Sequence, residues 1–158
     1  MVMESFDKII TGAGFKSSVH ILRVSIDHPE IAYIVKKMLA KTRKSFQSLY
    51  FVLDWARDGN DLTPGSILKI AIFDNNRTEI LLVVQQLRQW LVDLGYTIDQ
   101  AKKTVRPYFR TTPEHDKHEI YSEFSKKNSV IRILVCSESL GIGVNFDDIA
   151  RVVQYGFP

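Results

Sequence analysis

The chain has 158 residues, of which 45% are hydrophobic and 25% charged, so it has the composition of one folded domain and not of a disordered polymer. Its apolar runs are far shorter than the ~20 residues of a membrane helix, and its acidic start does not fit a secretory signal, which together predict an intracellular protein. A single cysteine excludes an internal disulfide, and a net charge of +3 is too small to identify a partner.

The first part of the chain predicts two extended segments and a helix, followed by a turn-rich break at 58–65. Residues 19–24 and 31–35 are short and rich in β-branched side chains, which is typical of strands or extended segments. Ser45 is a candidate cap for the helix that follows. The apolar face of this helix consists of Phe46, Leu49, Tyr50 and Leu53.

After the break, a strand and a long helix are expected. Residues 67–73 are almost continuously apolar, as in a strand covered on both faces. The helix has Asn76 as its N-cap, Glu79 three residues later and Gly95 at its end. Its apolar positions are Ile80, Val84, Leu87, Leu91 and Leu94.

The same order then repeats. An extended piece is expected at 104–109, and strands are expected at 130–136 and 149–153. Between them lies a helix opened by Thr112 and Pro113. Its inward side chains are Ile120 and Phe124. Alternating helices and buried strands predict a single α/β domain, with a parallel sheet covered by helices on both faces.

Ligands of such folds bind at loops that follow the carboxyl ends of the strands. Three loops meet this description, at 74–78, 110–114 and 137–145. Basic residues also gather in two stretches, and each stretch either faces phosphate groups or is a solvated surface. The first contains Lys36, Lys37, Lys41, Arg43 and Lys44, and the second contains Lys102, Lys103, Arg106 and Arg110.

Two glycine motifs do not fit the chemistry that they suggest. A phosphate loop needs four residues between its glycines, whereas Gly12 and Gly14 are separated by one. Gly141 and Gly143 begin a dinucleotide fingerprint, but Phe146 occupies the place of its third glycine. A dinucleotide cofactor is therefore not expected.

The sequence also does not match the motifs of a zinc site or of a nucleophilic cysteine. His115 and His118 lack the spacing of the His-Glu-x-x-His zinc motif, so exposed histidines are expected. Cys136 ends an apolar strand without a placed histidine, which favours a buried core thiol over a nucleophile. No metal site is expected in this chain.

The C-terminal sequence IRILVCSESLGIGVNFDDIARVVQYGFP, residues 131–158, resembles motif V and the following strand of superfamily-two helicases, most closely the RecQ-like group. ILKIAIFDNNR, at 67–77, is similar to motif IV, and VRPYFRTTPEHDKHEIYSEF, at 105–124, occupies the place of the Tyr-His-Ala segment and its helix. LRVSIDHPEIAYIV, at 22–35, is similar to the stretch that opens the second lobe.

There are departures from the RecQ-like pattern. Phe109 and Arg110 replace His-Ala, Asn75 and Asn76 stand where serine is usual, and residues 146–147 lack the frequent proline.

The resemblance implies a RecA-like fold, with residues 1–18 as a lead-in and 19–158 as a second helicase lobe that ends before motif VI. It also implies an intracellular protein, nuclear in a eukaryote, that acts as part of an ATP-dependent 3′-to-5′ DNA helicase. Its partners would be DNA, single-stranded or unwinding, and a first lobe. ATP and Mg²⁺ would bind only in the complete helicase, because this chain matches neither the phosphate-loop lysine, the acidic metal site nor the arginine finger.

The resemblance further implies two sets of site residues and no catalytic residue in this chain. Together with the basic stretch that ends at Arg110, the expected nucleic-acid contacts are Asn76, Arg77, Arg110, Ser137, Gly141 and Gly143. The residues expected at the cleft between the lobes are Glu138 and Asn145. Two alternatives stay open: a non-catalytic α/β module that binds nucleic acid or protein, and an unrelated α/β protein for a small ligand.

Overall fold

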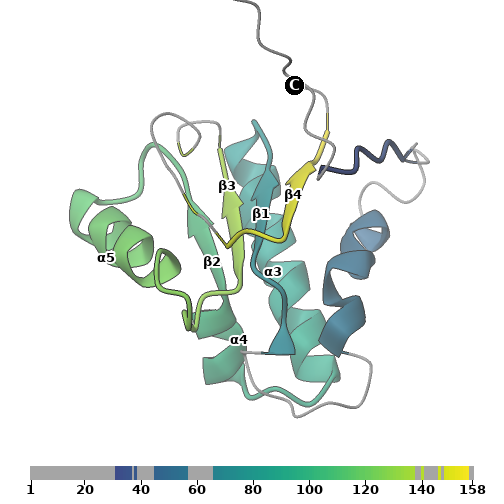
Figure 1. Cartoon of the computed structure of the whole chain (residues 1–158), viewed down its shortest axis with the longest axis horizontal. Helices are drawn as coiled ribbons and strands as arrows, with labels where there is room; N and C mark the ends of the chain where they lie inside the picture. The colour runs from purple at the N-terminus through teal and green to yellow at the C-terminus, as the bar shows by residue number, and fades with distance from the viewer. Residues whose placement is uncertain are drawn as a thin grey trace, which may run out of the picture. The chain divides into compact units, whose positions relative to one another are not determined.

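The computed structural model describes residues 31–36, 38, 45–56, 66–137, 140, 146 and 148–156 (Figure 1). The chain divides into two compact units, 1–37 and 38–158. In the first unit, residues 31–36 are exposed and contain no strand, so the strand considered for 31–35 is wrong. A segment that buries no face has no packing to stabilise a strand. The segment at 19–24 and the boundary expected after residue 18 lie outside the described residues.

One parallel sheet lies at the centre of the second unit. Its described strands are β1 (Ile70–Phe73), β2 (Val105–Tyr108), β3 (Ile133–Cys136) and β4 (Arg151–Gln154). The strand order is β2-β3-β1-β4, and every neighbouring pair is parallel. The predicted α/β class is therefore confirmed, although each strand has only four residues and is shorter than the segment predicted for it.

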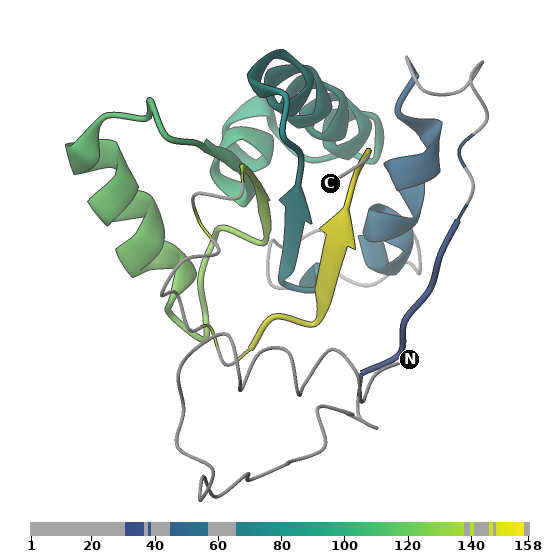
Figure 2. The same cartoon turned by 90° about the horizontal axis from the view of Figure 1, so that it is seen from above.

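Helices cover both faces of this sheet (Figure 2). One layer contains the 3₁₀-helix η1 (Gln47–Ala56), α3 (Arg77–Asp93) and α4 (Ile98–Thr104), and the opposite layer contains α5 (Glu114–Phe124). None of the helices in the described part of the chain has the length and apolarity to cross a membrane.

The two layers divide the side chains of the sheet between two cores. Successive side chains of a strand point to opposite faces. In β3, Ile133 and Val135 join the core beneath α3, whereas Leu134 joins the core beneath α5. Ile120 and Phe124 are buried in that second core, as predicted.

Helix α3 forms as its sequence predicts. The side-chain oxygen of Asn76 accepts hydrogen bonds from the backbone N–H groups of Thr78 and Glu79, at 2.9 and 3.3 Å. These bonds satisfy donors that would otherwise lack an intrahelical partner. Beyond its end, Gly95 has a φ of 100°, a backbone conformation that favours glycine.

The helix before the break is confirmed, but its type differs. η1 is a 3₁₀-helix, and Phe46, just before it, has a φ of 53°. That unusual conformation is held by packing: the Phe46 side chain is buried, and its ring lies 6.0 Å from that of Tyr155. Leu49 and Leu53 are buried as expected.

Helix α4 was not predicted. Thr97 and Gln100 form a complete capping box at its start. At its other end, the Arg88 guanidinium donates to the carbonyl oxygens of Lys102 and Val105, at 3.4 and 2.8 Å. Burial, with a smaller contribution from the neighbouring Arg106, lowers the pKa of Arg88 from its usual value. The Arg88 guanidinium therefore donates to carbonyl groups at the end of α4, where the last carbonyls of a helix have no partner within the helix.

A buried lysine joins three segments at the amino ends of the strands. Lys69, just before β1, is 1% exposed and contacts both carboxylate oxygens of Asp148 at 2.7 Å. Its ammonium also donates to the carbonyl oxygen of Lys126, at 3.0 Å, and lies 4.9 Å from the ring centroid of Phe124. A charge removed from water needs such partners. Lys69 therefore fixes the segments before β3 and β4 against β1.

Replacing Asp148 with alanine should destabilise the fold by about 3 kcal/mol, because the buried ammonium would lose its counter-charge. Lys69→Met should cost less, since the apolar stem is retained and the side chain of Asp148, which is 34% exposed, can be hydrated. Urea unfolding followed by circular dichroism measures both changes.

The control is Asp99→Ala, which breaks an exposed ion pair with Lys103 and should change the free energy of unfolding by less than ~1 kcal/mol. Equal losses for Asp148→Ala and Asp99→Ala would contradict the anchoring role of Lys69.

Candidate nucleic-acid interface

The carboxyl ends of the strands are level with one another along one edge of the sheet. Phe73 pairs with Cys136 and Gln154, and Tyr108 pairs with Cys136. The loops that follow β2, β3 and β1 therefore start side by side, in that order. We call this edge the carboxyl rim.

Backbone hydrogen bonds continue the sheet for one residue into these loops. The Ser137 N–H donates to the carbonyl oxygen of Tyr108 at 3.1 Å, and the Asp74 N–H donates to that of Cys136 at 3.0 Å. The starts of two of the predicted ligand loops are thus held by the ladder itself. Ser137 is half-buried at this point, where its loop leaves β3.

Arg77 reaches the rim from the first turn of α3. The Asn76 N–H donates to a carboxylate oxygen of Asp74 at 2.7 Å, which closes a tight turn between β1 and α3. The guanidinium of Arg77 lies 5.0 Å from the ring centroid of Phe109, in the loop after β2. This cation–π contact links the chain after β1 to the loop after β2, although β3 lies between these two strands.

The loop between β2 and α5 is itself a closed turn. The Phe109 N–H donates to the Thr112 hydroxyl at 3.2 Å, and the Thr112 N–H donates back to the Phe109 carbonyl at 2.9 Å. Arg110 and Thr111 lie at the exposed tip of this turn. Helix α5 then begins after Pro113, without a side-chain cap.

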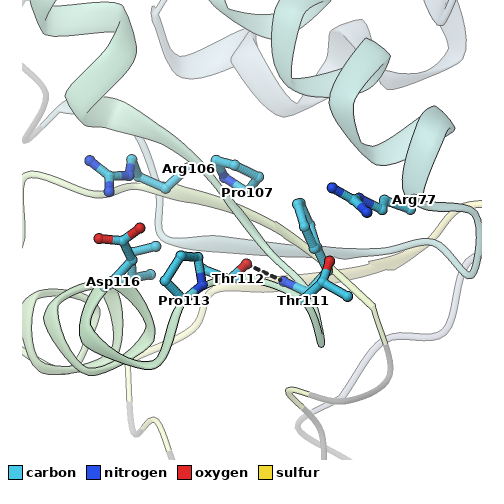
Figure 3. Close-up of a pocket in the computed structure, with 9 residues that line it drawn as sticks. Arg77, Arg106, Pro107, Thr111, Thr112, Pro113 and Asp116 are labelled. Atoms are coloured by element: carbon cyan, nitrogen blue, oxygen red, sulfur yellow. Dashed lines mark hydrogen bonds between the residues drawn. The ribbon is translucent and has the colours of Figure 1, made fainter.

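A cavity of about 270 Å³ opens between this turn, β2 and the starts of α3 and α5 (Figure 3). Its lining combines apolar rings, hydroxyl groups, two guanidinium groups and one carboxylate. The residues that line it are Arg77, Arg106, Pro107, Phe109, Thr111, Thr112, Pro113, Asp116 and Ile120.

Four of the residues predicted for nucleic-acid contact therefore belong to the loops of the carboxyl rim. They are Asn76, Arg77, Arg110 and Ser137. The other predicted site residues, Gly141, Gly143, Glu138 and Asn145, lie outside the described residues. Phe109 and Asp116, which line this cavity, were not predicted as site residues. Only Phe109 carried a signal in the sequence, because it stands in place of the histidine of the RecQ-like pattern.

Metal binding and a reactive cysteine are the other chemistries that the described residues bear on. His115 and His118 are exposed on α5, and no group of three or more His, Cys, Asp and Glu side chains among the described residues is placed to hold a metal ion. Cys136 is buried, which confirms the predicted core thiol, and burial raises the pKa of its thiol to about 12. At neutral pH it is a thiol and not the reactive thiolate.

Cys136 should resist alkylation in the folded protein. At pH 8 its raised pKa keeps it protonated, so iodoacetamide should label it orders of magnitude more slowly than in urea. Because the chain has one cysteine, intact mass spectrometry counts the modification directly. Labelling at the same rate with and without urea would show that the thiol is neither buried nor protonated.

These elements define a RecA-like α/β lobe whose polar loops gather at the carboxyl edge of a parallel sheet. Residues 65–158 match the family model described as Helicase conserved C-terminal domain. This match covers more than half of the chain, and the chain belongs to that family. It therefore carries the C-terminal lobe of a superfamily-two helicase. A comparison with curated proteins finds no match.

Proposed function

We propose that this chain is the second motor lobe of a RecQ-like 3′-to-5′ DNA helicase, and that its carboxyl rim holds the backbone of single-stranded DNA. Membership of the helicase C-terminal family supports the general function. The RecQ-like assignment and the polarity rest on the sequence similarity at 67–77 and 131–158. The observation that carries the DNA contact is the position of Arg77, Arg110 and Ser137 in three adjacent loops.

The chemistry of the rim suits a phosphate backbone. An arginine side chain can donate two parallel hydrogen bonds to a phosphate, and a serine hydroxyl can donate one. Arg77 and Arg110 follow different strands, so a nucleic-acid strand lying across the rim would meet both charges in succession. Such contacts position a strand without reading its sequence, as a translocating motor requires.

Asn76 would serve the helix and the ligand with different atoms. Its side-chain oxygen accepts two backbone hydrogen bonds of α3. The amide NH₂ group is then the part of the side chain that can donate to a phosphate. We therefore assign the oxygen to capping and the NH₂ group to DNA.

ATP and Mg²⁺ would bind in a cleft shared with a first RecA-like lobe. The described residues provide no metal site of their own. Glu138 and Asn145, which we place toward the cleft by their similarity to motif V, follow the same strand as Ser137. In this proposal the lobe grips DNA at the rim and moves as a rigid body when the cleft closes.

Arg77→Ala should weaken the binding of oligothymidylate roughly tenfold at low salt, because a charged hydrogen-bond donor is lost. The slope of log K against log salt concentration should also fall by about one unit. Fluorescence anisotropy over a salt series measures both quantities.

The control is Lys127→Ala, which removes the same charge from the exposed turn after α5, at the opposite edge of the sheet. If Arg77→Ala leaves the slope unchanged, Arg77 is not a phosphate contact.

The motor function is tested by joining the chain to a first RecA-like lobe and a motif VI segment of a RecQ-like helicase. This fusion should hydrolyse ATP faster when single-stranded DNA is added and should unwind duplexes with a 3′ tail. Unwinding of 5′-tailed duplexes instead would overturn the polarity. A folded fusion that binds DNA without hydrolysing ATP would identify the lobe as a non-catalytic binding module.

A further inference from the structure

The turn between β2 and α5 presents an exposed threonine. Thr111 lies at the tip of this turn beside Arg110, whereas the hydroxyl of Thr112 accepts the N–H of Phe109 within the turn. Thr111 is also the only serine or threonine of the 158-residue sequence that has an acidic residue three positions later, which is Glu114. An exposed hydroxyl followed by a carboxylate is the kind of charge pattern by which protein kinases select their substrates.

The carboxylate that such a kinase would recognise is accessible. The Glu114 side chain is 77% exposed, and its ion pair with Lys117, at 2.6 Å, is a surface contact of the kind that contributes little to stability. Helix α5 begins after Pro113 without a side-chain cap, so its first turn opens at low cost. The turn and the start of α5 can therefore enter a kinase active site as an extended peptide.

A phosphate on Thr111 would have an arginine as its partner. Thr111 and Arg77 line the same cavity and lie on the same side of it (Figure 3). The one carboxylate of the lining, that of Asp116, lies on the other side, near Arg106. The Arg77 guanidinium is held 5.0 Å from the ring centroid of Phe109, beside the turn. Phosphothreonine carries a charge of roughly −1.5 to −2 at neutral pH and forms strong paired hydrogen bonds with arginine.

We propose that Thr111 is a phosphorylation site that releases the lobe from DNA, modified by a protein kinase that recognises an acidic residue downstream. In this step the threonine oxygen attacks the γ-phosphorus of ATP, the bond to ADP breaks, and the hydroxyl proton passes to a base of the kinase. The new phosphate pairs with Arg77 and occupies the guanidinium that would otherwise hold a DNA phosphate. This inference rests on the proposed function, because Arg77 must be a DNA contact for the switch to act.

The site is tested by treating the full chain with an acidophilic protein kinase and ATP and counting the added phosphate by intact mass spectrometry. One phosphate is expected on the wild type and none on Thr111→Val, which keeps the shape of the side chain without its hydroxyl. Equal phosphorylation of both proteins, or of neither, would overturn the site.

The switch is tested by fluorescence anisotropy with oligothymidylate. Phosphorylation should weaken binding about tenfold at low salt, because one phosphate contact is lost and a negative charge is added beside the strand. The matched control is Thr111→Val treated with the same kinase, which should bind as tightly as the untreated wild type. Normal binding that phosphorylation leaves unchanged would overturn the switch alone. Failure of the untreated chain to bind any strand would overturn the proposed function as well.

The pairing with Arg77 has a measurement that needs no DNA. In a phosphorus NMR titration, the pKa of the phosphate on Thr111 should be lower in the wild type than in Arg77→Ala, because a neighbouring guanidinium favours the dianion. Equal midpoints in the two proteins would overturn the pairing, whatever the outcome with DNA.

Discussion

Parallel pairing with level strand ends is the constraint on which the site depends. Phe73, Tyr108, Cys136 and Gln154 each end a strand, and their register brings them to one edge. Residues that are far apart in the sequence, such as Arg77 and Arg110, thereby reach the same edge of the sheet. The opposite edge carries the ion pair between the buried Lys69 and Asp148, so this stabilising contact and the proposed ligand contacts lie at different ends of the strands.

The elements that were predicted are those whose sequence carries both a boundary signal and an apolar period. Helix α3 has the Asn76 cap, a regular apolar face and Gly95, and it forms as expected. Helix α4 has a capping box, but it is only seven residues long and buries only Ala101 and Thr104, so periodicity could not reveal it. The 3₁₀ geometry of η1 could not be predicted either, because its apolar spacing also fits an α-helix.

The loops of the candidate site could be predicted from the sequence, because apolar runs indicate where strands end and parallel pairing brings those ends to one edge. The cavity could not be predicted. It depends on Arg77 lying over Phe109 and on Asp116 of α5 lying at the same end of the cavity as Arg106 of β2 (Figure 3), and these positions arise from tertiary packing between elements that sequence spacing does not relate. Membership of the helicase C-terminal family supports a helicase function in general, whereas the roles proposed for individual side chains rest on their positions at this edge.

The cation–π contact between Arg77 and Phe109 has a mechanical consequence. Arg77 belongs to the helix after β1, Phe109 follows β2, and β3 lies between these two strands. If Arg77 holds a nucleic-acid strand as proposed, tension on that nucleic acid would be transmitted through the Phe109 ring to β2 as well as directly to β1. The force would then be distributed over two strands of the sheet instead of one.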